Sequence, residues 1–188
     1  FPVQWHEASS QGGTVRMAYM DIAPTARANG RTLVLLHGKN FCAATWGQTA
    51  RTLAAKGYRV IIPDQIGFCK SSKPGGYQYS FHALAALTAG LLEREGATKV
   101  TLVGHSTGGI LGIRFALTYP DRVDRLVLVN PLGLNDTLAE GVPYSDLGIL
   151  RTEEQKIDAA SIKAYQLRTY YHGQWRADYD RWVAMLAG

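Results

Sequence analysis

Residues 99–111, KVTLVGHSTGGIL, decide how the rest of this chain is interpreted. The stretch contains Gly104, Ser106 and Gly108 in GxSxG spacing. An apolar run precedes the serine and a small-residue segment at helical spacing follows it, so we predict a strand, a sharp turn and a helix. At such a turn the serine hydroxyl is exposed, and the flanking glycines let neighbouring backbone come close. The pattern favours a nucleophilic serine; the alternative is a glycine-rich turn with a bystander serine.

The backbone N–H groups from Thr107 onward open the predicted helix. They therefore have no partner within the helix and lie at the positive end of its dipole. Donors of this kind stabilise the negative oxygen that develops in acyl transfer.

Composition indicates a globular chain. The 188 residues are 46% hydrophobic, enough for one core with an appendage. The net charge of +5 is scattered, with no basic run typical of nucleic-acid binding. No apolar run is long enough for a membrane span. The first residue is Phe1, which we interpret as a sign that an upstream segment was removed; exported and cytoplasmic locations both stay open.

Strands and helices alternate along residues 1–131. Residues 3–8 and 14–21 predict a hairpin. Continuous apolar runs predict strands buried on both faces of a parallel sheet at 32–36, 58–62, 100–103 and 123–129. Helices are predicted between them at 45–56, 80–96 and 108–119. The alternation predicts an α/β fold with a mostly parallel, doubly wound sheet. Chemistry is expected at the strand ends, where the sequence places His37, Asp64, Ser106 and Asn130.

The alternation stops at residue 132. Residues 132–151 are predicted as a loop, and 153–171 and 177–187 as amphipathic helices. We interpret 1–131 as the core domain and 132–188 as a helical cap or lid over the strand ends. The cap is rich in aromatic residues: Tyr144, Tyr165, Tyr170, Tyr171, Trp175, Tyr179 and Trp182. Aromatic side chains at helical spacing usually form core, and they favour a partly apolar acyl or aryl substrate only weakly.

Four motifs occur in a recognisable order. They are HGKNFCAATW at 37–46, DQIGFCKSSKP at 64–74, GHSTGG at 104–109 and YPDRVDRLVLVNP at 119–131. Together they resemble the α/β-hydrolase fold superfamily, with the nearest similarity to its serine esterase, C–C-bond hydrolase and perhydrolase branch. The resemblance covers residues 3–134. It implies an eight-stranded sheet whose second strand is antiparallel, and a Ser, His, acid triad.

The resemblance also implies roles for individual residues. Ser106 matches the nucleophile, and the backbone N–H groups of Thr107 and Lys39 match the oxyanion hole. His37 matches a position that orients its loop, and Asp64 matches one that braces its own turn. A serine at this turn argues against the dehalogenase and epoxide-hydrolase branches, which attack with a carboxylate. No metal or cofactor is implied.

The two cysteines depart from the family pattern. Cys69 stands where the resembled loop usually has a second glycine, and Cys42 lies in the loop after the adjacent strand. A disulfide would suit an exported protein. Two buried thiols that pack as small hydrophobic groups are the equal alternative.

The base and the acid of a triad are missing from the expected positions. None of the five histidines matches the family's base, including His172 in the cap, and Asp136 matches an alternative acid position only loosely. We therefore expect the chain to be the N-terminal part of a serine hydrolase that acts on a small molecule. A second polypeptide would carry the last strands, the acid and the histidine. The alternative is a non-catalytic hydrolase-fold binding protein or an inactive fragment.

Overall fold

The computed structural model describes residues 1–135, 139–141 and 145–187. The chain forms two compact units, Phe1–Leu134 and Asn135–Gly188. Among the described residues, no helix combines the length and the apolar character that a membrane span needs.

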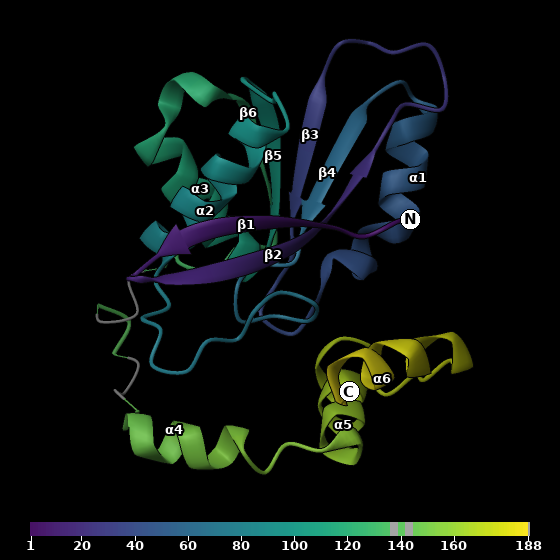
Figure 1. Cartoon of the computed structure of the whole chain (residues 1–188). Coiled ribbons are helices and arrows are strands. Elements are labelled where there is room, and N and C mark those ends of the chain that lie inside the picture. The colour runs from purple at the N-terminus through teal and green to yellow at the C-terminus, as the bar shows by residue number, and fades with distance from the viewer. Residues whose placement is uncertain (136–138, 142–144, 188) are drawn as a thin grey trace. The chain divides into compact units, whose positions relative to one another are not determined.

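The first unit is built on a mixed sheet (Figure 1). Its strands are β1 (Gln4–Ser10), β2 (Gly13–Ile22), β3 (Thr32–Leu36), β4 (Arg59–Pro63), β5 (Val100–His105) and β6 (Val123–Val129). The described strands lie in the order β1-β2-β4-β3-β5-β6. β3 to β6 are parallel, whereas β2 is antiparallel to both β1 and β4. The predicted α/β class with a mostly parallel core is confirmed, and the second strand is antiparallel as the resemblance implied.

Helices cover both faces of this sheet (Figure 1). They are α1 (Gly47–Ala55), α2 (Phe81–Arg94) and α3 (Thr107–Thr118), with 3-10 turns η1 (Ala43–Trp46) and η2 (Pro120–Arg122). On β3, Val34 and Leu36 join the core with α2 and α3, while Leu33 and Leu35 join the core with α1. Because successive side chains point to opposite faces, a strand covered on both sides must be apolar at every position.

β6 differs from its prediction as a strand buried on both faces. It is the last strand of the described sheet and pairs with β5. Val127 and Val129 are 43% and 41% exposed. An apolar sequence alone does not distinguish a central strand from an edge strand, because burial depends on what packs beside it.

The second unit is helical. It contains α4 (Leu147–Glu154), α5 (Ala159–Thr169), η3 (Ala177–Tyr179) and α6 (Asp180–Ala187). The single helix predicted at 153–171 is wrong, because α4 ends and α5 begins within it. The Asp158 carboxylate accepts from the Ser161 N–H at 2.8 Å, and the Ser161 hydroxyl accepts from the Asp158 N–H at 2.9 Å. This capping box starts a new helix, and its Asp-x-x-Ser spacing was a signal in the sequence.

Aromatic rings pack together inside the second unit. Tyr171 stacks on Tyr179 with ring centroids 3.9 Å apart, and Trp175 contacts both rings edge-on. Tyr144 of the predicted aromatic set lies outside the described residues.

Candidate functional site

Ser106 lies at the junction of β5 and α3 in an unusual backbone conformation. Its φ and ψ are 54° and −117°. Its N–H donates to the Val129 carbonyl at 3.1 Å, and its own carbonyl accepts from the N–H groups of Gly109 at 2.9 Å and Leu132 at 3.2 Å. Holding a residue other than glycine in such a sparsely populated conformation costs about 1–3 kcal/mol. The end of β6 and the loop after it therefore hold the serine in this conformation.

The glycines on either side of Ser106 are required by close backbone packing. A Cβ added at Gly104 would collide with the backbone of Gly108. One added at Gly108 would collide with the carbonyls of Leu36 and His37. The GxSxG spacing thus lets β5, α3 and the end of β3 approach one another around the serine.

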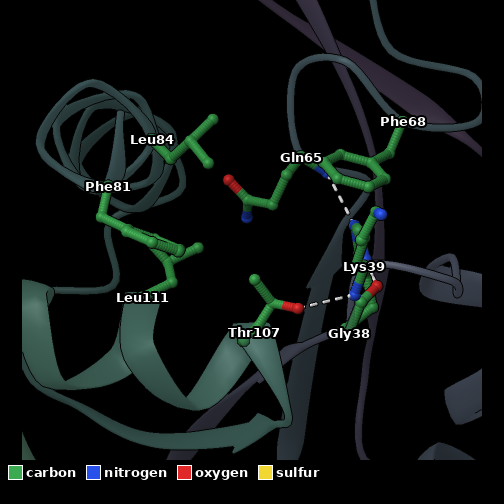
Figure 2. Close-up of a pocket in the computed structure, with 10 residues that line it drawn as sticks. Gly38, Lys39, Gln65, Phe68, Phe81, Leu84, Thr107 and Leu111 are labelled. Carbon is green, nitrogen blue, oxygen red and sulfur yellow. Dashed lines mark hydrogen bonds between the residues drawn. The ribbon is translucent and has the colours of Figure 1, made fainter. Parts of the chain in front are cut away.

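The loop after β3 passes beside Ser106. A Cβ built on Gly38 would lie 3.2 Å from the Ser106 Cβ. In the same loop the Lys39 N–H donates to the Thr107 hydroxyl at 2.9 Å (Figure 2). The structure therefore brings Lys39 and Thr107 together beside Ser106. The contact with the Thr107 hydroxyl was not predicted, although the threonine directly after the serine was visible in the sequence.

His37 is buried and uses both of its ring nitrogens. Nδ1 donates to the Gly38 carbonyl at 2.8 Å, and Nε2 accepts from the Gln65 N–H at 3.0 Å. Burial lowers the pKa of His37, against the opposing effects of the Gly38 hydrogen bond and the Asp64 charge. A neutral imidazole is needed for Nε2 to accept. These contacts tie the loop after β3 to the loop after β4, which fits an orienting role.

Asp64 holds the turn after β4 together. Its two carboxylate oxygens accept from the N–H groups of Ala43 at 2.7 Å and Lys70 at 3.3 Å. Its carbonyl accepts from the Ser71 hydroxyl at 2.6 Å. The geometry fits a bracing role.

Cys42 and Cys69 form a disulfide with their Cα atoms 6.1 Å apart. This decides between the two alternatives that the sequence left open. Cys69 has a φ of 45°, a conformation that glycine adopts most easily. The cysteine therefore occupies the glycine-like position that the family pattern predicts there.

A hollow opens beside Thr107 in the first unit. It has a volume of about 420 Å³ and is lined by Gly67, Phe68, Tyr79, Ser80, Phe81, Leu84 and Thr107. A smaller cavity of about 20 Å³ shares four of these residues, and its other walls are His37, Gly38, Lys39, Gln65, Gly108 and Leu111. From the sequence, we linked a partly apolar substrate to the aromatic residues in 132–188 and not to this hollow. Phe68 and Tyr79 lie in the connection between β4 and α2, and Phe81 begins α2. No sequence pattern marked these three residues, because only the folded course of that connection brings their side chains beside Thr107.

The remaining histidines occupy varied positions. His105 packs beside the rings of Phe41 and Trp46, and burial lowers its pKa. His6 is buried on β1, and burial lowers its pKa too. His82 is exposed on α2, and His172 is in the second unit. Asp136, the loosely matched acid, lies outside the described residues.

Part of this chain is similar in sequence to known hydrolases and dehalogenases. The 2-hydroxy-6-oxo-2,4-heptadienoate hydrolase of Pseudomonas putida is 36% identical over 115 residues, 60% of this chain and 42% of that protein. A haloalkane dehalogenase of Mycolicibacterium paratuberculosis is 37% identical over 121 residues, 62% of this chain and 38% of that protein. The chain thus spans about two fifths of the length of these curated relatives.

A solved structure matches over the whole chain. It is a probable hydrolytic enzyme from Pseudomonas aeruginosa PAO1, with a TM-score of 0.96 and 54% identity, covering 100% of this chain and 60% of that one. The family model described as alpha/beta hydrolase fold matches residues 31–156, well over half of the chain. With the sheet order, the turn at Ser106 and this match in agreement, the chain belongs to the alpha/beta hydrolase fold family.

Proposed function

We propose that this chain carries the nucleophile and the oxyanion hole of a serine hydrolase that cleaves an ester or a related acyl or C–C bond. The observation that carries the proposal is the positive φ of Ser106 at the junction of β5 and α3. Strained conformations of this kind cluster at functional sites and persist only where surrounding contacts impose them. Three backbone hydrogen bonds impose this one. A bystander serine would gain nothing from it.

The proposed oxyanion donors are the backbone N–H groups of Thr107 and Lys39. Thr107 is the first residue of α3, so its N–H points out of the helix end with the favourable dipole. The Lys39 N–H bonds to the Thr107 hydroxyl in the free protein. An oxyanion would replace that hydroxyl as its acceptor.

In the proposed reaction, the Ser106 oxygen attacks the substrate carbonyl carbon and passes its proton to a histidine. The leaving group takes that proton. Water then attacks the acyl-enzyme with the histidine acting as base, the bond between the acyl carbon and the Ser106 oxygen breaks, and the histidine returns the proton to that oxygen. We propose that the histidine and its acid come from a second polypeptide that adds strands beside β6. The exposure of Val127 and Val129 on β6 supports this, because such an edge is suited to further pairing.

The proposed substrate is a small molecule with a partly apolar acyl or aryl group. The walls formed by Phe68, Tyr79, Phe81 and Leu84 support it. Relatives named as hydrolases of 2-hydroxy-6-oxo dienoates favour C–C or ester chemistry over dehalogenation. Ser106 agrees with that choice, since dehalogenases attack with a carboxylate. We further propose that residues 132–188 act as a cap over the strand ends.

Labelling with a fluorophosphonate tests the nucleophile. The full-length natural protein is treated with the probe, digested and mapped, and its intact mass is recorded before digestion. We expect a phosphonyl adduct on Ser106, no adduct in Ser106→Ala, and wild-type labelling in the control Ser9→Ala, which changes an exposed serine of β1.

Each outcome separates the candidate functions. An adduct on Ser106 together with a co-purifying polypeptide supports a triad completed by a second chain. A single polypeptide in the intact-mass spectrum would contradict the proposal of a second chain. A protein that binds acyl compounds but is never labelled would favour the non-catalytic alternative.

A further inference from the structure

We propose that Gln65 is a specificity-determining residue whose side-chain amide donates a hydrogen bond to an uncharged acceptor oxygen of the substrate. This rests on the proposed hydrolase function. The preferred substrate would carry a ketone or similar carbonyl oxygen on its apolar chain, remote from the bond that is cleaved.

The side chain of Gln65 is buried and only partly satisfied. Its exposure is 2%, and its Oε1 accepts from the Thr88 hydroxyl at 3.4 Å. Its Nε2 is buried and has no hydrogen-bond partner among the residues that the structure describes. A buried amide donor without a partner is unfavourable, and native proteins rarely leave one in that state without a role for it.

The position of Gln65 is fixed from two sides. Its N–H donates to Nε2 of the buried His37, and its Oε1 faces Thr88 on α2. Between these anchors the amide extends into the space bounded by Phe81, Leu84 and Thr107 (Figure 2). The donor is therefore presented in a defined direction next to the proposed oxyanion hole.

The two cavities suggest how a ligand would reach this donor. The cavity at Gln65 holds about 20 Å³, which is space for roughly one oxygen-sized group. It shares Phe68, Phe81, Leu84 and Thr107 with the hollow of about 420 Å³. An apolar chain would fill the larger hollow and place one oxygen at its inner wall.

The lining favours a neutral acceptor. Apart from Lys39, the walls of both cavities are uncharged, and most are aromatic, aliphatic or glycine. A carboxylate would lose its hydration there with one amide donor in return, whereas a ketone oxygen loses much less. Sites built to bond a polar group discriminate strongly against analogues that lack it.

The test compares esters that differ in one oxygen. The full-length protein is assayed with 4-nitrophenyl hexanoate, 4-oxohexanoate and 5-oxohexanoate, and each kcat/KM is divided by the ester's alkaline hydrolysis rate. We expect wild-type to prefer at least one oxo ester by about 10-fold. In Gln65→Met, which has similar size and no donor, we expect the ratio to fall to about 1. Gln65→Glu should lower this ratio as well, because its carboxylate oxygen would face the carbonyl oxygen of the substrate and could not donate a hydrogen bond.

Gln48→Met, on the exposed face of α1, is the matched control and should keep the wild-type ratio. A defect in folding would lower kcat/KM for all three esters equally and would leave the ratio unchanged. Equal ratios in wild-type and Gln65→Met overturn the inference, even where Ser106 is labelled and the esters are hydrolysed.

A binding measurement covers the case in which no ester is hydrolysed, which would count against the proposed function. Hexan-3-one, which cannot be hydrolysed, is titrated into 15N-labelled protein. A selective shift of the Gln65 side-chain NH2 resonances supports the inference without catalysis. No shift at saturating ketone overturns it.

Discussion

At the scale of single residues, the contact between Lys39 and Thr107 has a direct consequence. The Lys39 N–H has one proton, and in the free protein it is donated to the Thr107 hydroxyl at 2.9 Å. If that N–H serves as an oxyanion donor, the hydroxyl competes with the transition state for it. A typical hydrogen bond contributes about 1 kcal/mol net, equivalent to roughly a five-fold change in rate.

Thr107→Val removes the competing hydroxyl and keeps the side-chain shape. We expect kcat/KM for a simple 4-nitrophenyl ester to rise by about five-fold. Thr52→Val on the exposed face of α1 serves as the control and should change nothing. A fall in kcat/KM for Thr107→Val would mean that the hydroxyl holds the loop in its active position instead.

At the scale of elements, the disulfide joins the loops that follow β3 and β4. Cys42 and Cys69 are 27 residues apart, and closing a loop of that length stabilises the folded state by about 3.5 kcal/mol in the chain-entropy model. The backbone at Cys69 has the opposite effect, because its φ of 45° is unfavourable for any side chain with a Cβ.

Two double variants separate these contributions. Cys42→Ala/Cys69→Ala should lose about 3.5 kcal/mol of unfolding free energy under non-reducing conditions. Cys42→Ala/Cys69→Gly should lose about 1 kcal/mol less, since glycine adopts positive φ without strain. Guanidinium denaturation measures both. Equal unfolding free energies for the two variants would show that the positive φ at residue 69 carries no cost.

At the scale of the whole molecule, buried histidines make stability depend on pH. Burial lowers the pKa of His6, His37 and His105 below the ordinary histidine value of about 6.5. Below about pH 6.5 these histidines bind protons in the unfolded chain but stay neutral in the folded protein. The unfolding free energy therefore falls as pH falls. Above that range the unfolded histidines are neutral too, and the contribution is complete.

We expect the unfolding free energy to be level from pH 8 to 7 and to decrease from pH 6.5 to 5. One histidine that stays neutral in the folded protein contributes at most about 1.4 kcal/mol per pH unit. His37 is expected to contribute because burial lowers its pKa. Urea denaturation at half-unit pH intervals measures the slope, and NMR titration of the imidazoles assigns it. A constant unfolding free energy between pH 7 and 5, or a His37 resonance that titrates near 6.5, would contradict the assignment.

The sequence determined the order and type of the elements in the first unit. Val34 and its neighbours form a run that is apolar at every position, and only a strand covered on both faces requires this. The requirement for Gly104 is equally local, because the turn between β5 and α3 brings the backbone of Gly108 against it. Gly108 is recognised from the same GxSxG spacing, although the backbone that it meets belongs to the end of β3. Such patterns depend on neighbours in the chain, so they are readable without coordinates.

The tertiary structure decided everything that depends on residues distant in sequence. The pairing of Cys42 with Cys69, the exposure of β6 and the contact of Lys39 with Thr107 each require loops or strands to be placed in space. Gln65 is the clearest case. Its type indicates a surface residue, and only the packing of α2 and His37 around it buries its amide beside Thr107. The spacing of apolar residues along a helix or strand indicates which of its faces is buried. It does not indicate which residues of another element pack against that face.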